Sequence, residues 1–443
     1  MKRILLAVVF SSVAQAGPLP SANADFPEQE PALVKVGWQL FYDPVLSGNR
    51  EVACASCHHP DFGTSDGVSL GLGDGALALG LDRHVTNDNM PEQRIPRNAP
   101  ALFNLGAKQF TTLFHDGRLQ VDASQPDGIR TPLGAEMITG FSGVLSAQSM
   151  FPVLSGDEMA GHYSENDIAQ AVRLGLLTGP DGAWDRIAKR VLAIEPYKVQ
   201  LEKVFGGAEL GFTHISDALA AFMASEWRSD NSSFDRYLRD NETMSDAAMR
   251  GMQLFYGKAA CDTCHVGQFQ TDHDFHAIAM PQLGPGKAAR FERHQRDVGR
   301  MRVTGDETDA YAFRTPSLRN VTVTAPYGHS GAYANLESVV LHHLDPVKSL
   351  LAYEKTQAVL PELTGADDWW VMNRPEEVSA IAAANELEAQ VLSEDEIADL
   401  LIFLEALSDP EAIAGRLGVP SSVPSGLEVV QGAVKTKDST KIY

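Results

Sequence analysis

Two copies of the pattern Cys-x-x-Cys-His contain every cysteine of this 443-residue sequence. They comprise Cys54, Cys57, His58, Cys261, Cys264 and His265. The pattern is the attachment motif of c-type haem, in which two thiols on one face of a short helical turn bond the vinyl groups of one macrocycle. The adjacent imidazole then faces the iron as its proximal ligand. The chain is therefore expected to carry two covalent haem c groups, with His58 and His265 as iron ligands.

Three other uses of cysteine fit this sequence less well. Four cysteines could form two disulfides in an exported protein, but all four lie within the two motifs. A structural zinc site draws its four ligands from one neighbourhood. A thioredoxin-like Cys-x-x-Cys accompanies a βαβ pattern, which this sequence lacks, and it does not call for the histidine that follows each pair.

The segments that precede the two motifs repeat as well. Both GWQLFY, from Gly37, and GMQLFY, from Gly251, read Gly-x-Gln-Leu-Phe-Tyr. Apolar periodicity predicts a helix over 31–44 and another over 245–257, so each half repeats a helix followed by a Cys motif. Such a repeat indicates duplication of one domain. Further helices are predicted over 164–177, 214–229, 334–344 and 393–407.

These elements predict a mainly α fold with two cytochrome c-like domains and one haem in each. The polar segment 228–244 is the candidate boundary, which gives domains at 17–240 and 241–410. Residues 63–100 are rich in Gly, Asp and Asn and are expected to form a long functional loop. Residues 411–443 contain GVPSSVPSG and are expected to form a wrapping tail.

The first sixteen residues, MKRILLAVVFSSVAQA, have the features of a secretory signal peptide. Lys2 and Arg3 are followed by the apolar run 4–10 and by a small-x-small cleavage site that ends at Ala16. No later stretch has the ~18 apolar residues that a transmembrane helix needs. The mature protein is therefore expected to be exported without a membrane span, which in a bacterium means the periplasm.

The formal net charge of −22 bears on the choice of partner. It argues against nucleic acid and anionic membranes, and it favours a basic protein partner. An acidic surface that only serves solvation has the same composition, so charge alone leaves both readings open.

From Gly37 to Leu407 the sequence resembles the di-haem cytochrome c peroxidase family, which includes MauG. The shared motifs are RNAPALFNL (97–105), LFHDGR (113–118), FPVLSGDEM (151–159), PQLGPG (281–286) and FRTPSLRNVTVTAPYGHSGAYANLESVV (313–340). The resemblance implies haems near the domain interface. It also implies that the N-terminal haem reacts with peroxide and that the C-terminal haem transfers electrons.

The family places a Gln and a Glu, ten residues apart, over the peroxide-binding haem. Gln148 and Glu158 match this spacing. A carboxylate at that place can take a proton from peroxide and return one to the leaving oxygen, and the amide can orient peroxide. Glu136 also precedes a Met, but it lacks the Gln partner and the Pro context.

For the second haem, the resemblance places the sixth iron ligand seven residues beyond a Leu, after the TAPY segment. Counting from Leu336 gives His343, and His342 next to it is the alternative. A His ligand lowers the reduction potential relative to the Met of the peroxidases.

The family also holds a calcium ion between the haems. The matching groups are the Asn98 side chain and the carbonyls of Thr324 and Pro326. Oxygen ligands of this kind suit calcium. Members of the family often form homodimers, so a homodimer is one assembly that the resemblance allows.

Two departures from the family pattern concern the haem environment. His115 stands where the family commonly has a Trp between the haems. Peroxidases of the family block the first iron at rest with a loop His, but here Asp74 has that position and His84 is the nearest candidate. An iron that is open at rest would resemble MauG.

Three functions follow from these observations. The first is a periplasmic peroxidase that reduces hydrogen peroxide with electrons from a small cytochrome c or a cupredoxin. The second is a MauG-like enzyme that uses peroxide to oxidise residues of a partner protein. The third is a di-haem electron carrier without enzymatic activity, against which the Gln148 and Glu158 pair argues.

Overall fold

The computed structural model describes residues 17–22, 24–86, 89–125, 127–162 and 165–430. The predicted signal peptide, 1–16, lies outside the described residues. The described chain is mainly helical, as the sequence predicts, and its strands are two or three residues long. No helix within the described ranges has an apolar stretch long enough to cross a membrane.

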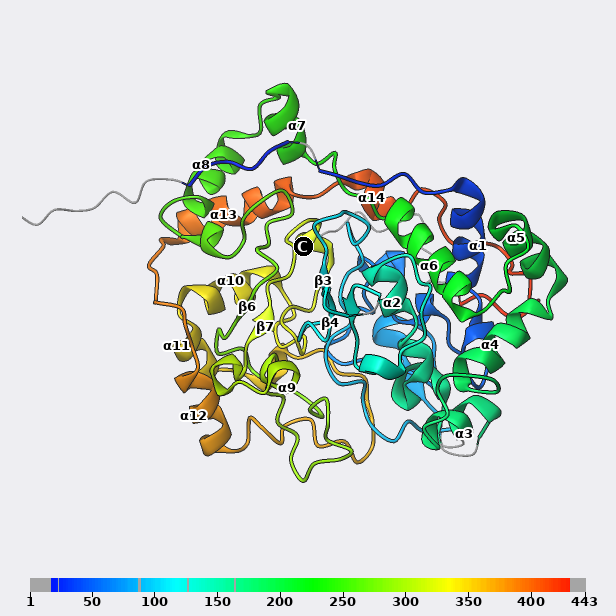
Figure 1. Ribbon diagram of the computed structural model, residues 1–443. Helices are drawn as coiled ribbons and strands as arrows, with labels where there is room; N and C mark the ends of the chain where they lie inside the picture. Colours follow the sequence, from blue (N-terminus) through cyan, green and yellow to red (C-terminus); the bar gives the residue numbers. More distant parts are fainter. Residues whose placement is uncertain (1–16, 23, 87–88, 126, 163–164, 431–443) are drawn as a thin grey trace, which may run out of the picture.

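The helices of the first half surround one core and those of the second half surround another (Figure 1). The first set is α1 (Pro31–Phe41), α2 (Val144–Ser149), α3 (Asp167–Arg173), α4 (Ala183–Leu192), α5 (Glu195–Phe205) and α6 (Phe212–Glu226). The second set is α7 (Ser233–Asp240), α8 (Asp246–Phe255), α10 (Leu336–Leu344) and α13 (Glu394–Ala406), with the short α9 (Met301–Thr304) in the same half of the chain. Helices α11 (Pro346–Leu351) and α12 (Pro375–Ala383) enclose a small third cluster, and α14 (Pro410–Ala414) packs against the first core.

Short antiparallel strands complete the fold. They are β1 (Ala76–Leu77), β2 (His84–Val85), β3 (Thr112–Leu113), β4 (Leu119–Val121), β5 (Ile129–Arg130), β6 (Phe275–His276) and β7 (Phe313–Arg314). The pairs are β1 with β2, β6 with β7, and the order β3-β4-β5, in which Thr112 lies opposite Gln120. In Figure 1 the strands β3, β4, β6 and β7 lie between the two groups of helices. Among its described residues, the predicted long loop 63–100 contains the β1-β2 pair and one turn of 3₁₀ helix, Gly80–Asp82, as its regular elements.

The repeated Gly-x-Gln-Leu-Phe-Tyr segments form equivalent helix crossings. Helix α1 packs against α6, and α8 packs against α13. A Cβ atom on Gly37 would overlap the backbone of Ala218, and one on Gly251 would overlap the backbone of Asp399. The Phe of each segment packs on a Phe of the partner helix, with ring centroids 5.2 Å apart for Phe41–Phe222 and 5.3 Å apart for Phe255–Phe403. Each glycine therefore allows the helix that precedes a Cys motif to approach the backbone of its partner helix closely.

We expect Gly251→Ala to destabilise the protein even though Ala favours helix by about 1 kcal/mol. The added methyl group pushes α8 away from α13, and overpacking of this kind costs about 1–3 kcal/mol. The measurement is the thermal midpoint of the haem-loaded protein, followed by far-ultraviolet circular dichroism. Gly211→Ala is the control, because a Cβ there meets no atom within 4 Å. An unchanged midpoint for Gly251→Ala would contradict the close crossing.

The two cores do not divide at residue 240. Helix α7 lies inside the segment proposed as a boundary, and its Phe234 packs in the second core. Leu70, from the loop after the first motif, also packs there. Two separate segments from the first 240 residues therefore pack in the second core, whereas a single linker between two domains would cross only once.

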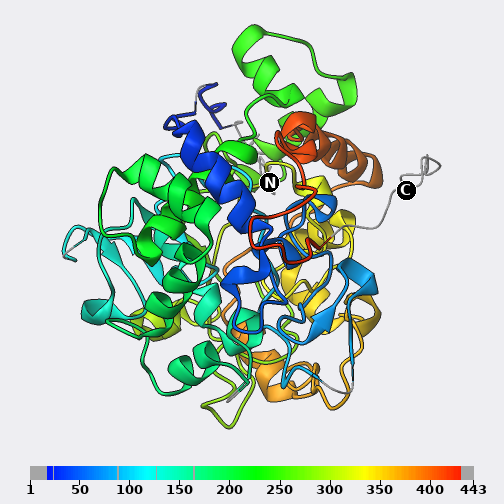
Figure 2. The ribbon, with the colours of Figure 1, turned by 90° about the vertical axis from the view of Figure 1, so that its right-hand side faces the viewer.

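Both ends of the described chain also cross between the halves. Gly17 donates its backbone N–H to the carbonyl of Tyr256 at 2.7 Å. Near the other end, Ser425 donates to Asp43 at 2.7 Å, and the Trp38 indole donates to the carbonyl of Gly418 at 2.7 Å. Figure 2 shows this C-terminal segment, in red, running beside α1. Residues 412–430 thus cover the first core.

Candidate active site and haem pockets

The first cavity brings the first Cys motif together with the two predicted catalytic side chains. Cys54, Cys57, His58, Gln148 and Glu158 all line it. Helix α1 leads into the motif, α2 carries Gln148, and a π-helical turn at Gly156–Ala160 carries Glu158. Segments about a hundred residues apart in the sequence thus converge on one space.

Local hydrogen bonds shape the first motif. A 3₁₀ turn at Cys54–Ser56 lets the N–H of His58 donate to the carbonyl of Cys54 at 3.0 Å. The Nδ1 atom of His58 donates to the carbonyl of Thr64 at 2.9 Å. This bond fixes the tautomer and leaves Nε2 unprotonated, as an iron ligand must be.

The second motif has the same local structure. The N–H of His265 donates to the carbonyl of Cys261 at 2.9 Å, and its Nδ1 donates to the carbonyl of Gln270 at 2.9 Å. Burial, and then the neighbouring His343, lowers the pKa of His265 to about 4. The histidines of both motifs are therefore held as neutral imidazoles with Nε2 available.

The thiols of the two motifs are shielded from solvent. Burial raises the pKa of Cys54, Cys57 and Cys261 to about 12. Burial thus favours the neutral thiol at these three positions.

Gln148 presents an acceptor that no described residue satisfies. Its Oε1 is buried and has no hydrogen-bond partner among the described residues. Such groups are rare in native proteins and point to a bound molecule. Glu158 enters the same cavity from a turn capped by Ser155, whose Oγ accepts from the N–H of Glu158 at 3.3 Å. π-helical turns of this kind recur at functional sites.

Two cations share the first cavity with Glu158. The guanidinium carbon of Arg118 lies 3.5 Å from the ring centre of Phe114, and its Nη1 bonds Asp116 at 3.0 Å. Lys287 comes from the second half of the chain, and burial, together with the charge of Arg118, lowers its pKa. Paired Arg and Lys side chains suit the carboxylates of a haem.

The second cavity contains the second Cys motif and His343. Cys261, Cys264, His265 and His343 line it, and the ring centres of the two histidines lie 6.2 Å apart. The Nδ1 of His343 bonds the carbonyl of Val339 at 2.8 Å, which leaves Nε2 as a ligand.

His342 has a different environment from His343. It is fully buried, its Nδ1 bonds the hydroxyl of Tyr333 at 2.8 Å, and its Nε2 bonds the carbonyl of Ile278 at 2.7 Å. Both ring nitrogens are therefore occupied, and His342 does not line the second cavity. This geometry favours His343 as the sixth ligand.

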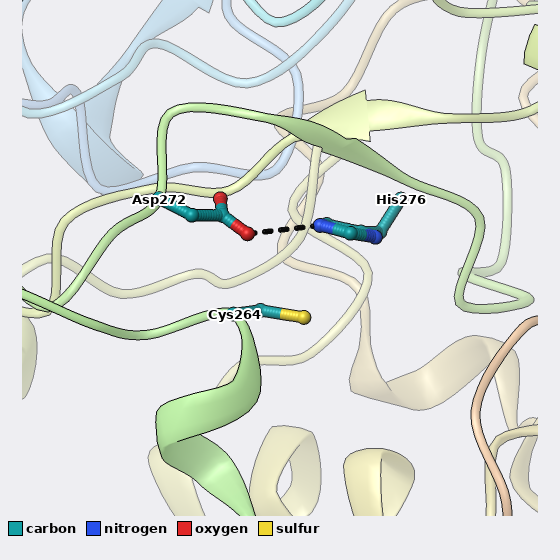
Figure 3. A group of neighbouring side chains, drawn as sticks. All are labelled: Cys264, Asp272 and His276. Carbon is teal, nitrogen blue, oxygen red and sulfur yellow. Dashed lines mark hydrogen bonds and ion pairs between the residues drawn. The ribbon is translucent and has the colours of Figure 1, made fainter.

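Cys264, Asp272 and His276 form a group with metal-ligand chemistry at the edge of the second cavity (Figure 3). The Nε2 of His276 lies 3.0 Å from Asp272, and its Nδ1 lies 3.2 Å from Glu386. Burial lowers the pKa of His276, but these two carboxylates raise it above its usual value overall. Because Cys264 belongs to the second Cys-x-x-Cys-His motif, which is predicted to bind haem, the group fits an ion pair beside that motif rather than a separate metal site.

A thin wall separates the two cavities. Asn98, Pro100, Leu105 and His115 line both of them. Burial, and then the charge of Arg97, lowers the pKa of His115 well below its usual range, so this imidazole is neutral. The position that the resemblance assigns to a Trp is thus a buried, uncharged imidazole in contact with both sites.

A buried ion-pair cluster supports this wall. Arg97 pairs with Asp116 at 2.8 Å and with Asp297 at 2.7 Å. Burial opposes the charge of Asp297, but Arg97 lowers its pKa below the usual range. Phe313 stacks on His329 with ring centres 3.7 Å apart, and Arg97 lies over the face of Phe313. The cluster joins residues from both halves of the chain.

The three predicted calcium ligands lie around the second cavity. Asn98, Thr324 and Pro326 all line it. The amide nitrogen of Asn98 donates to the carbonyls of Val68 and Ser69 at 2.9 and 3.3 Å. Among the described residues no hydrogen-bond donor to the side-chain oxygen of Asn98 is found, so this oxygen could serve as a cation ligand.

Neither His84, the candidate for blocking the first iron, nor Asp74, which has the position of the family's loop His, lines the first cavity. His84 is exposed, and its Nδ1 bonds the carbonyl of Asp82 at 2.8 Å. Asp74 is buried beside Asn49. Neither residue lines the cavity that contains His58 and Glu158.

Sequence reasoning missed Lys287 and gave no role to Arg97 or Arg118. Arg97 and Arg118 lie at the ends of the motifs RNAPALFNL and LFHDGR, and Lys287 directly follows PQLGPG. Their positions within or next to family motifs could have marked these three residues as candidates for the site. That Lys287 enters the cavity of the other half could be learned only from the tertiary structure.

Comparison with known proteins agrees with this geometry. The model of the family "Di-haem cytochrome c peroxidase" matches residues 31–243. The chain is 31% identical to the methylamine utilization protein MauG of Methylorubrum extorquens over 333 residues, 74% of this chain and 71% of that protein. It is 26% identical to the cytochrome c551 peroxidase of Nitrosomonas europaea over 76% of this chain and 80% of that protein.

A solved structure shares the fold. The crystal structure of a MauG-like protein associated with microbial copper homeostasis has a TM-score of 0.59 and 24% identity, with 92% of this chain and 97% of that chain covered. Since the sequence match to MauG spans more than two thirds of both chains, this chain belongs to the family of di-haem cytochrome c peroxidases and MauG proteins.

Proposed function

We propose that this protein reduces hydrogen peroxide to water at a haem c in the first cavity. A second haem c, in the second cavity, would relay electrons from a small cytochrome c or a cupredoxin. The observation that carries the proposal is the convergence of Gln148, Glu158 and the Cys54–His58 motif on one cavity. In that setting a haem iron supplies the site that binds peroxide and accepts oxidising equivalents.

The side chains of the first cavity divide the proton chemistry between them. The Glu158 carboxylate takes the proton from the near oxygen of peroxide and delivers it to the leaving oxygen. Gln148 orients peroxide through its unsatisfied amide. Arg118 and Lys287 add positive charge beside the developing negative charge of the leaving group.

The second cavity has the residues of an electron-transfer site. Imidazole ligation by His265 and His343 would close both faces of the iron and keep substrates away. His115 and its neighbours in the shared wall keep the two sites close, which suits electron transfer between them. The net charge of −22 favours a basic donor protein. Export to the periplasm, the calcium ion at Asn98, Thr324 and Pro326, and a homodimer belong to the same proposal.

A second candidate function is the oxidation of residues in a partner protein, as the family includes MauG. The specific observation in its favour is that neither His84 nor Asp74 lines the first cavity. Without a blocking side chain, a haem held by His58 would leave the side of the cavity with Gln148 and Glu158 open to peroxide in the fully oxidised protein. His343, in place of the Met of the peroxidases, points the same way.

Rapid mixing of the haem-loaded protein with one equivalent of hydrogen peroxide tests the proposal. With both irons ferric, an immediate change of the visible haem bands favours the MauG-like function. Reaction only after one haem has been reduced, followed by fast turnover with a reduced cytochrome c, is the result expected for a peroxidase. No reaction in either state would leave an electron carrier and overturn the enzymatic proposal.

A further inference from the structure

A second group of metal-ligating side chains lies outside both haem cavities, next to the segment that carries Glu158. One carboxylate oxygen of Asp74, one of Glu165 and one ring nitrogen of His162 all lie within 4.8 Å of one another. The Nδ1 of His162 is 3.3 Å from Oε1 of Glu165, a separation typical of two ligands about 2.1 Å from one zinc ion. None of the three residues lines a haem cavity.

Asp74 supplies an independent sign that a cation belongs there. Its side chain is 1% exposed, and its Oδ1 is buried with no hydrogen-bond partner among the described residues. The other oxygen, Oδ2, accepts from the amide of Asn49 at 2.8 Å. A buried carboxylate oxygen without a partner is costly, and a metal ion satisfies it.

The neighbouring groups are arranged as an outer layer around such an ion. The amide nitrogen of Asn49 bridges Asp74 and Glu165, at 2.8 Å from each carboxylate. The N–H of His162 donates to Oε2 of Glu165 at 2.8 Å. Each carboxylate is thereby oriented by a hydrogen bond on one of its oxygens, as metal-ligating carboxylates commonly are.

Charge also favours a cation. Burial and the nearby Glu165 raise the pKa of Asp74 to about 6, against the hydrogen bond from Asn49. Two carboxylates in one partly buried place repel each other unless positive charge lies between them. His162 is 12% exposed and Glu165 is 32% exposed, so an ion can reach the group from solvent.

We propose that Asp74, His162 and Glu165 bind one divalent transition-metal ion, for which zinc is the probe. Two carboxylates and an imidazole suit zinc or manganese, whereas calcium and magnesium prefer oxygen ligands alone. Binding at Nδ1 of His162 moves the ring proton to Nε2. That exchange gives up the 3.3 Å hydrogen bond between Nδ1 and Oε1 of Glu165, which the ion replaces by binding both atoms, and the long contact of 3.4 Å from the N–H of Glu92.

The ion would tie two segments together behind the first cavity. Gly73, next to Asp74, lies so close to the backbone of Asp157 and Glu158 that a Cβ atom would overlap both. His162 and Glu165 follow the π-helical turn that ends at Ala160. The metal would therefore hold the Glu158 turn in place from outside, as a positioning device whose effect on peroxide chemistry rests on the proposed function.

Isothermal titration of the haem-loaded protein with zinc chloride tests the site, after chelator treatment and dialysis into buffer that contains calcium. We expect one zinc ion per chain, and a rise of the thermal midpoint when zinc is added. His162→Gln and Asp74→Asn should each weaken this binding by about tenfold or more. His162 is partly exposed, so its substitution tests the site even where Asp74→Asn fails to fold.

His294→Gln is the matched control. His294 lies 3.7 Å from a carboxylate of Glu292 and is partly exposed, but it belongs to no metal-ligating group found among the described residues. Its zinc affinity should equal that of the parent protein. Zinc binding that persists unchanged in both His162→Gln and Asp74→Asn overturns the proposal, and so does the absence of binding to both zinc and manganese. Zinc binding by a protein that does not react with peroxide would refute the proposed function and leave the metal site standing.

Discussion

Replacing Glu158 by Gln is expected to slow the reaction of the haem-loaded protein with hydrogen peroxide by about 10²- to 10⁴-fold. The amide keeps the size and most contacts of the side chain but cannot take the peroxide proton. Glu158 lines the first cavity together with His58, whereas Glu136, the other glutamate that precedes a methionine, does not line it. The measurement is the second-order rate constant for the loss of the resting haem spectrum under excess peroxide.

Glu136→Gln is the matched control for this variant. Glu136 also precedes a methionine, but it is exposed and does not line the cavity. Its rate constant should equal that of the parent protein. Equal rates for Glu158→Gln and the parent, with both haems attached, would remove Glu158 from the proton chemistry. Loss of rate in Glu136→Gln would point to the earlier Glu-Met pair instead.

Replacing His343 by Met is expected to raise the reduction potential of the second haem by on the order of 0.1 V. Axial ligands move haem potentials over a range of ~0.8 V, and thioether ligation stabilises ferrous iron relative to imidazole. His343 lines the second cavity and leaves Nε2 free, so its loss changes the iron ligands directly. Potentiometric titration, followed in the visible haem bands, measures the shift.

His342→Gln tests whether His342 contributes to packing or ligates the second haem. His342 bonds Tyr333 and Ile278 through its two nitrogens, so its substitution should cost about 1–3 kcal/mol of stability. The potential of the second haem should stay unchanged. A large shift in His342→Gln together with no shift in His343→Met would show that the neighbouring residue is the ligand. The fully reduced and oxidised spectra of both variants identify the ligand set independently.

Much of this arrangement is readable from local sequence. The two Cys-x-x-Cys-His motifs specify their own geometry, because the turn, the thiols and the imidazole lie within five consecutive residues. Helices α1, α6, α8, α10 and α13 follow apolar periodicity and appear where it predicts them. Ser245 caps α8 through the N–H of Ala248, as a serine at a helix start should.

Other features needed contacts between distant segments. Helices α4 and α5 were not predicted. The boundary at 240 was inferred from polarity, although Phe234 faces the second core from within that segment. The few apolar residues of a mostly polar helix do not show which core the helix packs against until the partner surface is known.

The choice between His342 and His343 shows the same limit. Both residues lie on one helix, and either imidazole can ligate iron. The structure distinguishes them because Tyr333 and Ile278 occupy both nitrogens of His342, whereas His343 faces the second cavity. Those partners lie 9 and 64 residues away in the sequence.

Local sequence is enough to predict the two Cys-x-x-Cys-His motifs and the helices that precede them, because a few consecutive residues encode each of these, whereas the pairing of Gln148 with Glu158 was implied by the family resemblance. Only the tertiary structure placed Lys287 beside Glu158, His115 in the wall of both cavities, and Asp74 next to His162 and Glu165. The physical reason is that these groups are joined by packing across long loops. Long loops bring residues together that lie far apart in the sequence, and the periodicity of the sequence does not show which residues will meet.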